Sequence, residues 1–336
     1  MRPLKGKVAV VAGATRGAGR GIACMLGEAG ATVYCTGRSM RGEPSPTRRP
    51  ETIDETAKMV TALGGLGLWA QVDHTQPNQV QALFERVRQE QDGRLDILVN
   101  DISGDWNFDR DILSGKMQQS FWKQSLERGL KAQQDGVHSH LITSYYAVPL
   151  MVERSQGLIV EVNDGNWLEY NDCGVFYSLT KTSAVLIVYF MSEELREHNV
   201  AVVSLTPGWL QSESMLDGFG VTEENWHDVI RTEPDFARSE TPIYIGRAVA
   251  ALAADPNVME KTGHALSSGY LAREYGFTDM DNTQPICRIR RADPGAGLGC
   301  IPGDGDLEAV HRRCNSHLFR LLGAKWLHPV AHCACI

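Results

Sequence analysis

A cluster of glycines between an apolar segment and a helical pattern constrains the fold of this chain more than any other feature. Residues 8–12 form a short apolar, β-branched run typical of a buried strand, and residues 13–19 read Gly-Ala-Thr-Arg-Gly-Ala-Gly. A helical pattern follows from Gly19 to Glu28. Gly13 can make the tight turn, while Gly17 and Gly19 let the backbone approach a pyrophosphate at the helix N-terminus. The segment predicts a dinucleotide-binding β-turn-α unit, although such glycines can also serve helix–sheet packing alone.

The rest of the chain repeats this alternation. The patterns predict strand 32–36, helix 51–63, strand 67–72, helix 77–89, strand 97–100, helix 137–151, strand 157–162, helix 177–198, strand 201–205 and a last strand near 264–267. Strands that alternate with helices form a parallel sheet. We therefore expect an α/β fold, a Rossmann-type doubly wound sheet of seven parallel strands, in a single domain over residues 1–285. Residues 286–336 are then a C-terminal extension of unknown role.

Three segments stand outside this alternation: 39–50, 101–115 and 211–241. In an open α/β sheet, ligands bind beyond the carboxyl ends of the strands, where these segments must emerge. We expect them to surround the substrate. For residues 39–50, a solvated loop without a binding role is an equally good interpretation.

Composition excludes several classes of function. The formal net charge of -8 argues against a nucleic-acid partner, which needs a concentrated basic face. The longest uninterrupted apolar runs fall far short of the ~20 residues that span a bilayer, so no membrane segment is expected. The N-terminus has no apolar core of a secretory signal, which predicts a cytoplasmic location. Cys24, Cys35 and Cys173 lie in segments typical of helix, strand and loop, so reduced thiols are expected.

The last fifty residues no longer follow the α/β alternation. Six of their Cys and His residues could be offered as zinc ligands: Cys314, His317, His328, His332, Cys333 and Cys335. Their spacing matches no known zinc module, so we expect no metal site. A partly disordered or surface-docked extension with one amphipathic helix over residues 307–322 is the favoured interpretation.

The end of the second predicted strand indicates the choice of cofactor. It reads Tyr34-Cys-Thr-Gly-Arg38, without the Asp or Glu that accepts the ribose hydroxyls of NAD. Arg16 in the glycine turn and Arg38 instead supply two guanidinium groups, which suit a 2′-phosphate. NADP(H) is therefore predicted over NAD, although either arginine alone could be a surface charge.

Tyr177 and Lys181 form the candidate chemical pair. They open a predicted helix, and their spacing of four residues places the phenol and the ammonium on one face. A phenol is a poor base at neutral pH, but a nearby ammonium favours the phenolate. Tyr177 could then give a proton to a carbonyl oxygen or take one from an alcohol. The Tyr-x3-Lys pattern is common by chance, so its weight depends on the rest of the sequence.

That context resembles the short-chain dehydrogenase/reductase family over residues 6–285. The resemblance rests on the Gly-x3-Gly-x-Gly spacing, on Tyr177 and Lys181 at the expected distance, and on Pro207-Gly208 after the sixth strand. It implies cofactor contacts from Gly13, Thr15, Arg16, Gly17, Gly19, Arg38, Asp73, Asn100, Tyr177, Lys181, Pro207, Gly208 and Ser212. In the family, the residues at Asp73 and Ser212 contact the adenine and the carboxamide. Segments 136–140 and 269–279 indicate one particular branch of the family.

The resemblance also implies an NADP(H)-dependent oxidoreductase that interconverts a carbonyl and an alcohol on a small organic substrate. Helices that precede and carry the tyrosine in this family usually pack against a second copy, so a homodimer or homotetramer is expected. Two alternatives stay open: a cofactor-binding homologue without redox turnover, and a dehydratase or cyclase on the same fold. The retained Tyr177 and Lys181 argue against the first alternative.

Two positions depart from the family pattern. Asp164 stands where the family has the serine that orients the substrate, and Gln134-Asp-Gly-Val137 replaces a segment that often contains a water-binding Asn. An ionised carboxylate only accepts hydrogen bonds, so Asp164 would have to be neutral to polarise a carbonyl. We include Asp164 among the catalytic candidates. The alternative is that it caps its loop through Gly165 and never meets substrate.

Overall fold

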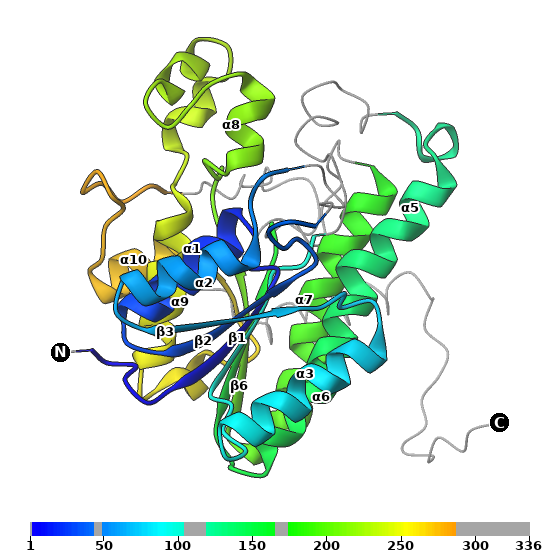
Figure 1. Ribbon diagram of the computed structural model, residues 1–336. Helices are drawn as coiled ribbons and strands as arrows, with labels where there is room; N and C mark the ends of the chain where they lie inside the picture. Colours follow the sequence, from blue (N-terminus) through cyan, green and yellow to red (C-terminus); the bar gives the residue numbers. More distant parts are fainter. Residues whose placement is uncertain (1, 44–48, 104–118, 165–173, 287–336) are drawn as a thin grey trace, which may run out of the picture.

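The structure is a computed structural model that describes residues 2–43, 49–103, 119–164 and 174–286 (Figure 1). Within these residues seven parallel strands form one sheet in the order β3-β2-β1-β4-β5-β6-β7. The strands are β1 (Val8–Ala12), β2 (Thr32–Gly37), β3 (Leu66–Gln71), β4 (Ile97–Asn100), β5 (Gly157–Val162), β6 (Val200–Thr206) and β7 (Ala265–Ser267). This order reverses beside β1, as in a doubly wound sheet. The predicted fold is confirmed.

Helices cover both faces of the sheet (Figure 1). One face packs on α1 (Gly17–Glu28), α2 (Ile53–Ala62), α9 (Pro242–Ala254) and α10 (Ser268–Tyr275). The other packs on α3 (Pro77–Glu90), α6 (Ser139–Val152) and α7 (Val175–Leu195), and α5 (Leu126–Gln133) lies beside α7. Along β1, Ala9 and Val11 join the first apolar cluster and Val8 and Val10 the second. Because successive side chains point to opposite faces, a strand covered on both sides must be apolar throughout.

The start of the helix predicted over 137–151 differs from the expectation. Residues Gln134–His138 form a single π-helical turn, and α6 begins only at Ser139. A Cβ on Gly136 would lie 2.4 Å from the Cγ2 atom of Thr180, so this turn packs tightly against α7. Single π-helical turns inside helices are frequent at functional sites. The turn coincides with the segment that departs from the family pattern.

Helix α7 is long and apolar. With the following turn it covers Val175–His198, and by length and composition alone it could cross a membrane, which the uninterrupted apolar runs in the sequence did not indicate. In the structure this helix packs on one face of the sheet, where Val188 and Leu195 join the second apolar cluster. The same helix carries Tyr177 and Lys181 in its first turns.

Residues 211–241, predicted as a loop, form together with residues 209 and 210 a small helical unit that we call the cap segment. It contains α8 (Glu213–Phe219) and the 3-10 turns η5 (Trp226–Arg231) and η6 (Pro234–Arg238), and it projects beyond the sheet (Figure 1). It has its own apolar cluster of Leu216, Val229 and Phe236. A parallel bridge between Leu210 and Glu240 closes its base. Residues 44–48 and 104–118, in the other two predicted substrate segments, lie outside the described part of the chain.

Candidate active site

The glycine turn after β1 is built for close backbone approach. Gly13 has a φ of +94°, and a Cβ there would lie 2.3 Å from the carbonyl oxygen of Asp101. A Cβ on Gly19 would lie 2.3 Å from the carbonyl oxygen of Gly13. Any side chain at either position would collide with backbone, so the turn requires glycine there. The resulting cradle fits the pyrophosphate of a dinucleotide.

The N-terminus of α1 already binds anionic groups of the chain itself. Its N-cap residue is Arg16, whose guanidinium has no acceptor atom for the helix N–H groups. The N–H of Gly17 donates to the Glu213 carboxylate at 2.8 Å, and the backbone of Gly19 donates to Asp101. Burial raises the pKa of Asp101 to about 7, while Lys181, His140 and Arg16 act in the opposite direction. This helix end attracts negative charge, as the positive end of a helix dipole should.

Arg38 follows β2 at its carboxyl end, where its carbonyl accepts from Gln71 Nε2 at 3.2 Å. Its neighbour Asp73 accepts from the N–H and the hydroxyl of Thr75 at 3.0 and 2.7 Å. Burial opposes ionisation of Asp73, but the bonds from Thr75, with a smaller effect of the Arg38 charge, lower its pKa. Asp73 therefore also fixes the turn between β3 and α3. The adenine contact that the family resemblance implies for Asp73 stays a prediction.

Asn100 lies at the end of β4, fully buried. Its Nδ2 donates to Glu161 Oε1 at 2.6 Å and to Ser144 Oγ at 3.0 Å. His140 lies against the other oxygen of Glu161 at 2.6 Å, and its Nε2 meets the carbonyl of Ile102 at 2.9 Å. Burial disfavours the charged imidazole, but Glu161 outweighs it and raises the pKa of His140. This buried network fixes the backbone that follows β4.

Glu161 and His140 were missed by sequence reasoning. A signal existed, because Glu161 is the one charged residue in the otherwise apolar strand Gly157–Val162. A fully buried carboxylate needs a partner, and that requirement could have directed attention to His140.

Tyr177 and Lys181 lie close together on one side of α7, as their spacing predicted. Tyr177 is buried in the first turn of α7, and the Lys181 Nζ atom lies 5.5 Å from the centre of its ring. The same Nζ atom forms an ion pair with Asp164 Oδ1 at 3.0 Å, just after β5. The structure thus brings the three predicted catalytic side chains into one cluster. Residues 165–173, including Gly165, lie outside the described part, so the capping alternative for Asp164 is untested.

Pro207, Gly208 and Ser212 follow β6 and lead into the cap segment. The N–H of Gly208 donates to Glu240 Oε2 at 3.0 Å, and Ser268 Oγ donates to the same oxygen at 2.6 Å. Burial raises the pKa of Glu240 to about 8. Ser212 accepts from the N–H of Met215 at 3.2 Å and so caps α8. Glu240 is a second buried carboxyl group that the sequence did not reveal.

The predicted cofactor and catalytic residues therefore gather along the carboxyl ends of β1 to β6, where an open α/β sheet binds its ligands. Their individual roles stay predictions. Over the described residues, no group of three or more His, Cys, Asp or Glu side chains is placed to hold a metal ion. The six zinc-ligand candidates of the C-terminal extension, and its predicted helix, lie outside that part of the chain. The division at residue 285 likewise stays a prediction.

Comparison with known proteins identifies the family. A family model described as short chain dehydrogenase matches residues 7–218. The mouse (Mus musculus) protein "Dehydrogenase/reductase SDR family member 1" is 37% identical over 281 residues, which cover 83% of this chain and 85% of that protein. It represents the branch that segments 136–140 and 269–279 indicated.

Solved structures show the same fold. A short chain dehydrogenase of Mycobacterium thermoresistibile has a TM-score of 0.69 at 24% identity and covers 89% of this chain and 95% of its own. A 3-oxoacyl (acyl-carrier-protein) reductase of Agrobacterium tumefaciens with NADP bound has a TM-score of 0.63 at 22% identity. The match covers 79% of this chain and 93% of that reductase. The matching family model and the similarity to the mouse protein agree with the sheet order, the glycine turn and the pair of Tyr177 and Lys181. This chain therefore belongs to the short-chain dehydrogenase/reductase family.

Proposed function

We propose that this protein is an NADP(H)-dependent oxidoreductase that interconverts a carbonyl and an alcohol on a small organic substrate. The observation that carries the proposal is the cluster of Tyr177, Lys181 and Asp164 beside the carboxyl end of β5, in a chain whose glycine turn fits a dinucleotide. When bound, the nicotinamide supplies or accepts a hydride. The remaining chemistry is a proton transfer, which falls to the residues of this chain.

Tyr177 transfers that proton. In reduction its hydroxyl donates to the oxygen of the substrate carbonyl, and in oxidation the phenolate accepts from the alcohol. The ammonium of Lys181, close to the ring, favours the phenolate form. Asp164 occupies the place of the family's serine, yet a carboxylate cannot donate to a carbonyl. We assign Asp164 the role of holding Lys181 through their ion pair at 3.0 Å.

The choice of NADP(H) rests on Arg16 and Arg38. They stand at the glycine turn and at the end of β2, and no acidic residue lies between Tyr34 and Arg38. Guanidinium groups bind phosphate through paired hydrogen bonds, whereas an acid at this position would repel it. The solved reductase of Agrobacterium tumefaciens with NADP bound is compatible with this choice.

The proposal is tested by following NADPH oxidation in the presence of ketones, aldehydes and quinones. We expect at least one carbonyl compound to be reduced, with one NADPH consumed per alcohol formed and two hydrogens added to the product mass. NADPH binding without turnover on any compound would favour a cofactor-binding homologue. A product whose mass is unchanged by two hydrogens would favour a dehydratase or cyclase.

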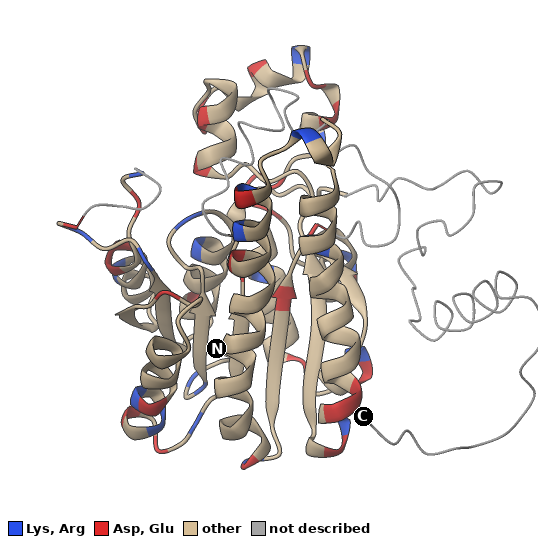
Figure 2. Cartoon of the chain, turned by 90° about the vertical axis from the view of Figure 1, so that its right-hand side faces the viewer, with Lys and Arg blue, Asp and Glu red and all other residues tan. Residues whose placement is uncertain are grey.

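We further propose that the chain forms a homodimer or homotetramer through α6 and α7. Figure 2 views the side that carries these helices, where long stretches of ribbon lack charged residues. Large apolar side chains are exposed on both helices: Leu141, Tyr145, Leu179, Leu186 and Phe190. Water-exposed apolar patches of this kind mark association surfaces.

Light scattering checks the proposed assembly. The wild-type protein should be a dimer or tetramer, and Phe190→Glu, which places a charge on a side chain that is 61% exposed, should shift it to a single chain. Met280→Glu is the matched control, because Met280 is 66% exposed and follows α10, which packs on the opposite face of the sheet from α6 and α7. A monomeric wild type would contradict the proposal.

A cytoplasmic location is also proposed. It rests on the buried free thiols of Cys24 in α1 and Cys35 in β2. Burial raises the pKa of both thiols, which keeps them protonated and unreactive. Such cysteines are typical of proteins in reducing compartments.

A further inference from the structure

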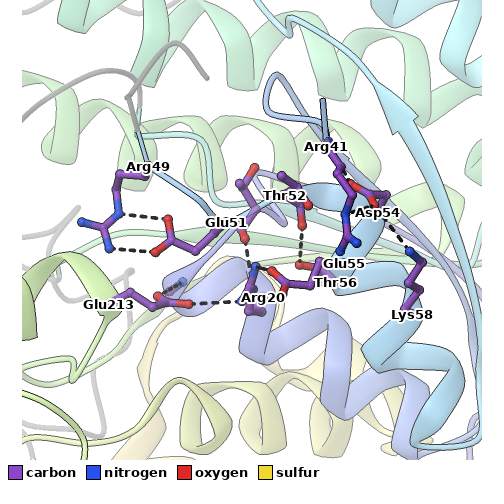
Figure 3. A network of polar contacts seen from close by, with 12 residues as sticks. Arg20, Arg41, Arg49, Glu51, Thr52, Asp54, Glu55, Thr56, Lys58 and Glu213 are labelled. Atoms are coloured by element: carbon purple, nitrogen blue, oxygen red, sulfur yellow. Dashed lines mark hydrogen bonds and ion pairs between the residues drawn. The ribbon is translucent and has the colours of Figure 1, made fainter. Parts of the chain in front are cut away.

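The cap segment reaches the glycine turn through one carboxylate. Glu213 is the first residue of α8, and its Oε2 accepts from the N–H of Gly17 at 2.8 Å. Its Oε1 lies 3.7 Å from Arg20 Nη1, and the two side chains face each other in Figure 3. The Glu213 side chain is only 27% exposed. These residues are almost two hundred positions apart in the sequence, so the contact joins the cap segment to the cofactor half.

The N–H group of Gly17 is also one of those expected to bind the cofactor's pyrophosphate. The first N–H groups of α1 point out of the helix and attract an anion, and the turn before them requires glycine for close approach. We propose that Glu213 is an internal competitor of the cofactor's pyrophosphate, which must displace it from Gly17 to bind. The inference rests on the proposed cofactor site, but not on a preference for NADP(H).

Arg20 does not depend on Glu213 for its position. Its Nε donates to the carbonyl of Thr15 at 3.0 Å, and its Nη2 pairs with Glu55 at 2.8 Å. Arg20 therefore stays beside the turn when Glu213 leaves. Its charge then attracts the pyrophosphate instead of the carboxylate. Two like charges cannot share one N–H donor, so the bound states of Glu213 and of the pyrophosphate exclude each other.

A second contact between α8 and the cofactor half is an exposed ion pair. Asp217, one turn along α8, pairs with Arg49 Nη1 at 2.8 Å, and Arg49 also binds both oxygens of Glu51 at 2.7 and 3.0 Å. Asp217 is 67% exposed, and pairs this exposed contribute little stability. Release of Glu213 leaves α8 packed through Leu216 on the apolar cluster of the cap segment. Cofactor binding therefore breaks one of the contacts that join α8 to the cofactor half.

Calorimetric titration of the full chain with NADPH and with NADH tests this competition. The charged hydrogen bond between Gly17 and Glu213 must break before the cofactor binds, so its removal should strengthen cofactor binding. We expect Glu213→Gln and Glu213→Ala each to lower the Kd by about tenfold. The factor should be equal for the two cofactors, because they share the pyrophosphate. Asp217→Asn weakens the ion pair between α8 and Arg49 but leaves Glu213 bound to Gly17. It should change the Kd for either cofactor by less than about twofold.

Glu223→Gln is the matched charge control, since Glu223 is exposed in the same segment. It should leave Kd unchanged, and thermal unfolding of each variant verifies that it is folded. Unchanged or weaker binding in both Glu213 variants would overturn the proposal, because Glu213 would then coexist with the cofactor. An equal gain in Asp217→Asn or Glu223→Gln would also overturn it. Failure of the wild type and all variants to bind either cofactor would instead refute the cofactor site itself.

Discussion

Replacing Tyr177 with Phe is expected to abolish carbonyl reduction while the affinity for NADPH stays nearly unchanged. Phenylalanine keeps the buried ring beside Lys181 but removes the hydroxyl that transfers the proton. Loss of a positioned acid costs about 10²- to 10⁴-fold in rate. The measurement is kcat on a substrate found in the NADPH oxidation assay, together with the Kd for NADPH by titration.

The control for this variant is Tyr270→Phe, which removes a hydroxyl from α10, away from the Tyr177 cluster. It should retain wild-type kcat. A large fall in NADPH affinity for Tyr177→Phe would indicate that the hydroxyl mainly binds the cofactor. Full activity on a confirmed substrate would mean that the proposed proton transfer does not operate here, and the dehydratase or cyclase alternative would then take precedence.

The second large effect concerns Arg38. Arg38→Asp removes a guanidinium that suits the 2′-phosphate and places a negative charge in the same position, so NADPH should bind at least ~100-fold more weakly. NADH lacks that phosphate and should lose only a few-fold. An aspartate here also resembles the acid that accepts ribose hydroxyls in NAD-selective sites. The ratio of the two Kd values, measured by titration, is the decisive quantity.

Arg41→Asp provides the matched charge reversal. Arg41 follows the same strand, but its side chain is 65% exposed and pairs with Asp54 at 3.5 Å. It should weaken NADPH and NADH by similar, small factors. If Arg38→Asp leaves the preference ratio unchanged, Arg38 has no part in recognising the phosphate.

The sequence predicted best what depends on local pattern. The bounds of β1, β4 and β5 agree with the prediction because each strand is a short, mostly apolar run of β-forming residues. Tyr177 and Lys181 face one side because helical spacing alone determines it. The family resemblance then supplied the relation between this pair and the glycine turn.

Contacts between distant residues could not be predicted in this way. Glu161 meets Asn100 across 61 positions, and Glu213 meets Gly17 across 196. Neither pair has a periodicity or a motif that links its members. The π-helical turn at Gln134–His138 was missed for a similar reason, because its cause is tight packing of Gly136 on Thr180 in another helix. Tertiary packing determines these features.

The cap segment was interpreted as a loop because its helices are short and lack a long amphipathic pattern. These short helices are stabilised by aromatic contacts with each other. The ring of Phe236 packs edge-on against three aromatic rings, with centroids 5.1 to 5.9 Å apart: Trp209, Phe219 and Trp226. Such mutual support among short helical turns is invisible to an analysis of one segment at a time.

That separate aromatic cluster also has an evolutionary meaning. Because the cap segment packs mainly on itself and closes at the bridge between Leu210 and Glu240, changes inside it leave the buried layers around the sheet intact. Selection can therefore exchange residues between positions 218 and 238, beyond the contacts of Glu213 and Asp217 with the cofactor half, while the glycine turn is inherited unchanged. Libraries designed to broaden or redirect this protein's chemistry belong in that stretch.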